Sequence, residues 1–216
     1  MSRVFLIIPL LSIAIASCGR VDSLSPKGTS TIVGYAGIDD QVKNLPANVS
    51  YNVRYYPNEQ TLKALVVALI GPGFSTQRNS KILHDWISTN IMYDIYAFNN
   101  GITPAPFALD VLSRREAVCQ GYAGLFYKMA TLAGLTVSAV TGADSNNHIW
   151  NAVQDGGVWK HIDSTWDAGF QNADLTWSQS YRTTYFYQSE TDMSSVTEHA
   201  MNGSAYKYDQ AFTDGQ

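Results

Sequence analysis

The sequence is poor in charge and in cysteine, and this narrows the possible functions. Only 15% of the 216 residues are charged, the net charge is −4, and no basic run extends beyond Arg114-Arg115. Such a chain offers no surface for a phosphate backbone, so we expect no nucleic-acid partner. With 45% hydrophobic residues the chain is not a disordered protein and can bury a core.

The chain also lacks a hydrophobic run long enough to span a bilayer. Its most apolar stretch, VFLIIPLLSIAIA at residues 4–16, follows Arg3 and is interrupted by Pro9 and Ser12. A basic residue before a short apolar run predicts a signal peptide over residues 1–17. The stretch ends in Ile-Ala-Ser-Cys, which resembles the lipobox of bacterial lipoproteins, where the cysteine is diacylated.

The lipobox resemblance implies a chain that is exported and anchored to a membrane of the bacterial cell envelope through Cys18. An ordinary signal peptide cleaved near Ala16 and Ser17 is the alternative. If Cys18 carries lipid, no other cysteine is left to form a disulfide with Cys119 in an oxidising compartment. Cys119 is then either a buried, inert thiol or a nucleophile.

Composition divides the rest of the chain into a flexible spacer over 18–50, rich in Ser, Gly, Thr and Asp, and one folded domain over 51–216. Helices preceding antiparallel strands predict an α+β fold. The predicted helices cover 59–70, 76–93, 107–114 and 119–133, with Asn58 as the N-cap of the first and Gly134 as the C-terminal glycine of the last. Leu132 is expected on the apolar face of the last helix. The predicted strands cover 51–56, 136–142, 148–153, 158–163 and 181–187.

Cys119 lies at the start of the predicted helix 119–133. There the positive end of the helix dipole stabilises a thiolate over a thiol. A helix start alone is weak evidence for catalysis, because a nucleophile also needs a base and a third group that orients the base.

The predicted hairpin supplies a base and an orienting group. With its turn centred on Asp155-Gly156, His148 lies directly across from Asp163, with Cβ atoms about 4.5 to 5.5 Å apart. That separation suits an imidazole and a carboxylate that orients it. A bulge at Gly156 or Gly157 would shift the register by one residue and turn the two side chains to opposite faces.

Two other interpretations of these residues stay open. His161 shares the predicted face of Asp163 and is an alternative base. Four side chains, Cys119, His148, His161 and Asp163, are also conceivable metal ligands. They lack the close CxxC or HxxxH pairs typical of zinc sites, so we expect no metal and no other cofactor.

The segments REAVCQGYAGLFYKMATLAGL, VTG, NNHIWNAV and VWKHIDSTWD, within about residues 80–190, resemble the bacterial transglutaminase-like superfamily, which shares the papain-like cysteine-protease core. The resemblance implies Cys119 as nucleophile, His148 as base and Asp163 as the orienting carboxylate. Ile162 replaces a valine that is common in the family. The implied fold places helices on an antiparallel sheet, with the nucleophile at a helix N-terminus.

The resemblance also implies a site for an oxyanion and a substrate cleft. The Cys119 N–H is one expected donor, and Tyr93 is our choice for the second. Trp166 is expected to line the cleft. Gln120 is not assigned an oxyanion role, because papain-like enzymes place their glutamine upstream of the cysteine. Asn151 faces away from His148 in the predicted hairpin, which favours a structural role.

The implied activity is thiol-dependent acyl transfer, with hydrolysis of a peptide or amide in the cell envelope as the leading hypothesis. The substrate would be a protein, a peptide or a peptidoglycan peptide. A protein-glutamine transglutaminase, which passes the acyl group to an amine, is the alternative within the family. A binding or scaffold module without turnover is the alternative of another class.

Overall fold

The structure is a computed structural model that describes residues 37–142, 148–171, 177–179, 181–196, 199 and 207–209. The first part of the chain is helical apart from two short strands: α1 (Asp40–Lys43), α2 (Ala47–Tyr55), α3 (Glu59–Leu69), α4 (Thr76–Asn90), β1 (Met92–Tyr93), α5 (Ile95–Asn99), α6 (Ala108–Arg114), β2 (Glu116–Ala117) and α7 (Cys119–Leu132). The second part is mostly strands: β3 (Val137–Thr141), β4 (Ile149–Asp155), β5 (Val158–Ile162), α8 (Ser164–Ala168), β6 (Gly169–Gln171), β7 (Trp177–Gln179), β8 (Phe186–Gln188), α9 (Glu190–Ser194) and β9 (Lys207–Asp209).

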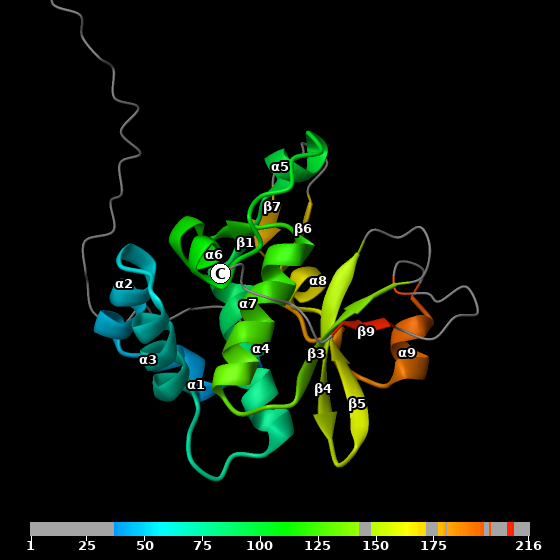
Figure 1. The fold of residues 1–216 in the computed structure, drawn as a ribbon, viewed down its shortest axis with the longest axis horizontal. Coiled ribbons are helices and arrows are strands. Elements are labelled where there is room, and N and C mark those ends of the chain that lie inside the picture. Colours follow the sequence, from blue (N-terminus) through cyan, green and yellow to red (C-terminus); the bar gives the residue numbers. More distant parts are fainter. Residues whose placement is uncertain are drawn as a thin grey trace, which may run out of the picture.

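The central sheet has the strand order β8-β5-β4-β3-β9, and every neighbouring pair is antiparallel. Most helices lie on one side of this sheet and α9 on the other (Figure 1). Successive side chains of a strand point to opposite faces. Val153 and Ile162 accordingly join the large core with the helices, while Trp150 and Ala152 join a smaller cluster with Met193 of α9.

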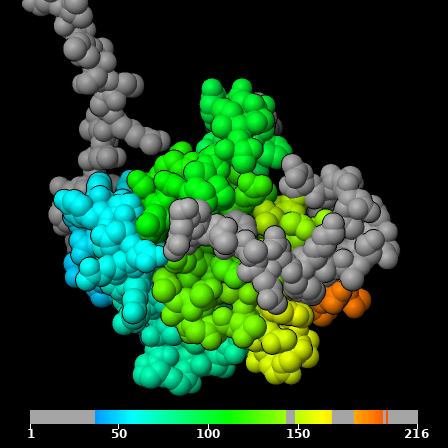
Figure 2. Space-filling model, in the orientation of Figure 1, coloured from blue at the N-terminus to red at the C-terminus, as the bar shows by residue number. Residues whose placement is uncertain are grey.

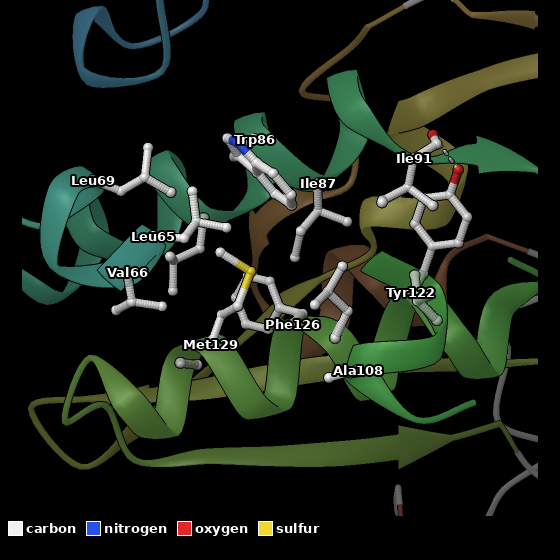
Figure 3. Close-up of a cluster of buried hydrophobic side chains, with 14 of the residues drawn as sticks. Leu65, Val66, Leu69, Trp86, Ile87, Ile91, Ala108, Tyr122, Phe126 and Met129 are labelled. Carbon is white, nitrogen blue, oxygen red and sulfur yellow. Dashed lines mark hydrogen bonds between the residues drawn. The ribbon is translucent and has the colours of Figure 1, made fainter. Parts of the chain in front are cut away.

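The large core is built where α3, α4 and α7 meet (Figure 3). Each helix places apolar residues three or four positions apart, so that one face is continuous and apolar. The buried residues at this contact are Leu65, Val66, Leu69, Trp86, Ile87, Phe126 and Met129. Helix α3 starts at the predicted N-cap, Asn58, whose side chain accepts a hydrogen bond from the Thr61 N–H.

The predicted α+β fold is confirmed, and α3, α4, α6 and α7 lie close to their predicted positions. Helix α7 starts at Cys119 as expected and is followed by Gly134, whose φ of 76° is the left-handed conformation that ends many helices. Leu132, predicted on the buried face of this helix, is 38% exposed.

The predicted spacer over 18–50 is too long at its C-terminal end. Residues 40–43 and 47–55 are helical, and Ile38 and Val42 are buried in the core. The strand expected over 51–56 was also wrong, because most of these residues belong to α2. Val49 and Val53 are one helical turn apart and face the core, and this spacing of four outweighs the β preference of the neighbouring tyrosines.

The pairing register of the hairpin between β4 and β5 differs by two residues from the predicted register. Asp155 pairs with Val158, and Gly156-Gly157 form the turn with φ values of 56° and 84°. Both values are positive, as the tight turns of hairpins require. A shift by an even number keeps each side chain on its predicted face, so His148 and Asp163 still lie on one side.

Two further predictions concern the strand expected over 181–187 and the N-terminal segment. The strand expected over 181–187 is formed only at β8, Phe186–Gln188. The predicted signal peptide over 1–17 and Cys18 lie outside the described residues.

Within the part of the chain that the structure describes, no helix has the length and apolar character needed to cross a membrane.

A buried polar network fixes α8 to α4. The His84 ring contacts Asp85 through Nδ1 at 3.1 Å and Asp167 through Nε2 at 3.0 Å, and all three side chains are fully buried. Asp85 also accepts from Lys81 Nζ at 2.6 Å and from the Tyr181 hydroxyl at 2.6 Å. Burial by itself would lower the pKa of His84, but the two carboxylates raise it overall.

We predict that His84→Ala destabilises the fold by about 3 kcal/mol, because it leaves two buried carboxylates without the imidazole between them. Urea unfolding measures the change. The matched control is Ser80→Ala on the same helix, since Ser80 is buried and its hydroxyl has no hydrogen-bond partner among the described residues. Equal unfolding midpoints for the two variants would show that the network contributes nothing.

Candidate active site

The candidate nucleophile is the first residue of a 14-residue helix. Cys119 follows Val118, an N-cap whose side chain makes no capping hydrogen bond. The thiol therefore lies at the positive end of the α7 dipole. Two residues on, Gly121 has no room for a side chain, because a Cβ there would lie 2.6 Å from the Ala117 Cβ and 3.0 Å from a Val111 methyl. This close packing holds the first turn of α7 against β2 and α6.

Two hydrogen bonds fix α7 from opposite sides. The Tyr122 hydroxyl donates to the backbone oxygen of Ile91 at 2.7 Å, which ties α7 to the end of α4 (Figure 3). The Asn151 side chain donates to the backbone oxygen of Ala123 at 3.1 Å, which ties α7 to β4. Both contacts are buried, so the position of the thiol is set by the helices and the sheet together.

His148 and Asp163 lie just beyond the paired ends of the hairpin. His148 precedes β4, Asp163 follows β5, and His148 Nε2 is 2.6 Å from Asp163 Oδ2. The Cys119 thiol is close enough to the imidazole to contribute to its raised pKa. Because Nε2 is engaged by the carboxylate, Nδ1 is the ring nitrogen available to the thiol. The His148 side chain keeps 12% of its surface exposed, whereas Asp163 is buried.

The Asp163 carboxylate accepts four hydrogen bonds. Oδ1 accepts from the backbone N–H groups of Thr165 at 2.9 Å and Trp166 at 3.2 Å, and so caps α8. Oδ2 accepts from His148 and, at 2.8 Å, from His199 Nε2. The four bonds fix both oxygens of the carboxylate in a single orientation.

The charges of these groups stabilise one another. Burial alone would lower the pKa of His148, but the Asp163 carboxylate and the Cys119 thiol together raise it to about 10. Burial alone would raise the pKa of Asp163, but His148 and His199 bring it well below its usual range. The arrangement therefore favours an imidazolium at His148 paired with a carboxylate at Asp163 at neutral pH.

Tyr93 and Trp166 also lie at this site. Burial, followed by the negative charges of Cys119 and Asp163, raises the pKa of Tyr93, so its hydroxyl stays protonated at neutral pH. The half-buried Trp166 ring lies 5.7 Å from the His148 ring. The structure thus brings Cys119, His148, Asp163, Tyr93 and Trp166 together. Cys18 is outside the described residues.

His161 has a different environment from the one its alternative role requires. Its Nδ1 accepts a hydrogen bond from Trp150 Nε1 at 3.0 Å, and the side chain is fully buried. Burial, and then the nearby His199, lower the pKa of His161 to about 4, so the ring is neutral. A neutral ring whose acceptor nitrogen is occupied does not act as the base for Cys119.

The structure brings together a different set of possible metal ligands from the one considered in the sequence. Within the described residues, the group whose ligand atoms lie close together, all within 4.8 Å, is His148, Asp163 and His199. Neither His161 nor Cys119 belongs to it. The 2.6 and 2.8 Å contacts within this group are hydrogen-bond lengths, shorter than the separation of about 3 Å or more between two ligands on one ion.

His199 is the member of the site that sequence reasoning missed. It is fully buried and follows α9, 36 residues beyond the Asp163 that it contacts. The surrounding sequence has no motif and no periodic pattern that would single it out. Its role can be recognised only from the contact itself.

The segment that carries the site is similar to a known protein superfamily. Residues 63–164, which include Cys119, His148 and Asp163, match the family model described as the transglutaminase-like superfamily. This segment, slightly less than half of the chain, is therefore similar to that superfamily. Its α+β arrangement, with the cysteine at a helix N-terminus and the helix packed on an antiparallel sheet, is the fold expected from the motifs.

Two curated relatives are kyphoscoliosis peptidases, from Homo sapiens and Mus musculus. Each is 31% identical to this chain, over 131 and 121 residues that cover 53% and 50% of it. The matches cover 20% and 18% of those proteins, so this chain spans about a fifth of their length.

Similar solved structures include a candidate cysteine protease from Cytophaga hutchinsonii and a TGase. The first has a TM-score of 0.40 and 22% identity, over 57% of this chain and 44% of that one. The second has a TM-score of 0.39 and 16% identity, over 69% of this chain and 37% of that one.

We predict that the stabilising effect of His148 falls as the pH rises. Its pKa is near 6.5 in the unfolded chain, so His148 adds stability below about pH 6.5 and loses it as the pH rises through about 10. The difference in unfolding free energy between wild type and His148→Ala should therefore shrink between pH 6.5 and 10, as measured by urea unfolding.

His161 is the control histidine for this experiment. Its contribution to stability should depend on pH in the opposite direction. Its folded-state pKa of about 4 lies below the unfolded value, so its contribution is present above about pH 6.5 and is lost as the pH falls. The difference between wild type and His161→Asn should shrink towards pH 4. A His148→Ala difference that is independent of pH would contradict the ion pair.

Proposed function

We propose that this protein catalyses thiol-dependent acyl transfer through Cys119, His148 and Asp163, and that its main reaction is hydrolysis of a peptide or amide bond. One observation carries the proposal: the His148 ring is hydrogen-bonded to a buried carboxylate and lies near a cysteine at a helix N-terminus. This arrangement supports Cys119 as nucleophile, His148 as base and Asp163 as the orienting group of nucleophilic catalysis.

The proposed reaction has two steps. The Cys119 thiolate attacks the carbonyl carbon, and the negative charge that develops on oxygen is stabilised by the Cys119 N–H and the Tyr93 hydroxyl. His148 then donates its Nδ1 proton to the leaving amine, and the carbon–nitrogen bond breaks to leave a thioester. In the second step His148 accepts a proton from water, which attacks the thioester, releases the acid and restores the thiolate.

Exposed apolar residues beside the site support a polypeptide substrate. Helix α5, at the top of the molecule in Figure 2, carries Tyr96 and Phe98, which are 70% and 60% exposed. The Phe98 ring lies 5.8 Å from that of Tyr93, so these residues extend the site outward. Aromatic side chains next to a nucleophile are suited to contact apolar parts of a peptide.

We expect Cys119 to react with iodoacetamide at neutral pH in the folded protein, because a cysteine at a helix N-terminus beside a cationic imidazole is a more reactive nucleophile. Peptide mapping by mass spectrometry locates the adduct, and Cys119→Ala is the control that loses it. The same variant should lose hydrolytic activity by about 10³-fold or more. An unreactive Cys119 in wild type would contradict the proposal and favour a binding module.

Transfer to an amine is the second candidate, because the superfamily match does not distinguish between water and an amine as acceptor. We expect hydrolysis to dominate. Incubation with a glutamine-rich protein and a fluorescent primary amine separates the two activities. Release of ammonia or peptide without incorporation supports hydrolysis, while stable fluorescence on the protein, absent with Cys119→Ala, supports crosslinking.

We further propose that the protein acts in the bacterial cell envelope, anchored by two acyl chains on Cys18. The lipobox-like Ile-Ala-Ser-Cys sequence supports this location, and two chains give stable anchoring where one does not. Cells fed a labelled fatty acid should incorporate it into wild type and not into Cys18→Ala. Equal labelling of the two proteins, or no labelling of either, would exclude the anchor.

A further inference from the structure

His199 gives the candidate active site a fourth member. Its Nε2 lies 2.8 Å from the same Asp163 oxygen that His148 contacts at 2.6 Å. The His199 ring is enclosed by aromatic side chains, with its centroid 4.7 Å from that of Trp150, 4.9 Å from that of Trp166 and 5.4 Å from that of Tyr185. Such a closely packed ring has little freedom to turn away from the carboxylate.

The second histidine solves a problem of orientation. Thr165 and Trp166 hold Oδ1 through their backbone N–H groups. His199 adds a second donor at Oδ2, beside His148. Oδ2 is then held where His148 Nε2 meets it, with the ring aligned for the thiol.

We propose that His199 is a positioning residue that fixes the Asp163 carboxylate, and through it the His148 ring, for attack by Cys119. This inference deepens the proposed function and rests on it. The chain segment after α9 thereby becomes part of the active site, although it lies outside the four sequence segments that carry the family resemblance and beyond the matched family segment, which ends at residue 164.

Several titratable groups lie around Asp163, and any of them that changes charge would affect a pH profile measured at this site. They are Cys119 and Tyr122 of α7, Tyr93 of β1, His161 of β5, His148 and His199. Tyr93 and Tyr122 have raised pKa values and His161 has a lowered one, so these three keep their neutral forms between pH 5 and 9. The Asp163 carboxylate, with its pKa well below the usual range, and His148, with its pKa raised to about 10, keep their charges over the same range.

The experiment compares His199→Phe with His199→Gln in the full-length protein. Phenylalanine keeps a ring among the aromatic side chains but removes the donor. Glutamine places an N–H near the position of the histidine Nε2 and so keeps it. Met193→Ala, in the neighbouring cluster with Trp150, is the control for loss of packing alone.

The first measurement is the rate of Cys119 alkylation by iodoacetamide from pH 4 to 9, which needs no substrate. In His199→Phe we expect the acidic limb to move up by about one pH unit, which is about a tenfold lower rate on that limb. His199→Gln and Met193→Ala should follow the wild-type profile. Superimposable profiles for all four proteins would overturn the proposal, as would a shift of equal size in Met193→Ala.

The second measurement is independent of the nucleophile. In Cys119→Ala protein, the His148 Nε2 proton is observed by proton–nitrogen NMR with and without His199→Phe. A changed His148 resonance that His199→Gln restores supports the positioning role even if wild-type Cys119 proves inert, which would refute only the proposed function. An unchanged resonance refutes the positioning role.

A shared metal ion is the competing explanation for two histidines around one carboxylate. If hydrogen bonds alone position the carboxylate, EDTA should leave the pH profile of Cys119 alkylation in wild type unchanged. Added Zn²⁺ should also leave it unchanged. A wild-type profile that EDTA converts into that of His199→Phe would overturn the proposal in favour of a metal site.

Discussion

The Asp163 carboxylate is the group on which the rest of the site depends. It is buried, and it accepts hydrogen bonds from two backbone N–H groups and two histidines. A buried charge is tolerated only when it is so well satisfied. Two of these bonds cap the N-terminus of α8, one orients the His148 ring and one holds the segment that carries His199. The same side chain therefore contributes to local structure, to stability and to the proposed chemistry.

Helix α4 is the frame that sets the distances within the site. Its C-terminal end accepts from Tyr122 of α7, Ser88 donates to the Ser164 backbone oxygen at the start of α8, and His84 contacts Asp167 at the other end of α8. Helix α7, which carries Cys119, and the helix capped by Asp163 are thus both attached to the same rigid element. This arrangement keeps the thiol, imidazole and carboxylate in register without any one loop having to hold them.

Much of this could be predicted from local sequence. Helix α3 was predicted from its Asn58 cap and α7 from its cysteine and terminal glycine, because these signals act within one turn. The hairpin register was wrong by two residues, since either of two Gly-containing turns fits the sequence, yet the face of His148 was right because an even shift preserves it. Helix α2 and His199 were missed because packing against distant residues decides both.

The central claim is that Cys119 forms a covalent acyl intermediate, and weighing that intermediate tests it most directly. Asp163→Asn weakens the orientation of His148 and should slow release of the acyl group. Incubation of this variant with a peptide library, followed by intact-mass and fragment spectrometry, should show an added acyl mass on Cys119. Unmodified Cys119 under conditions in which wild type hydrolyses the same peptides, or an adduct on another residue, would contradict the account.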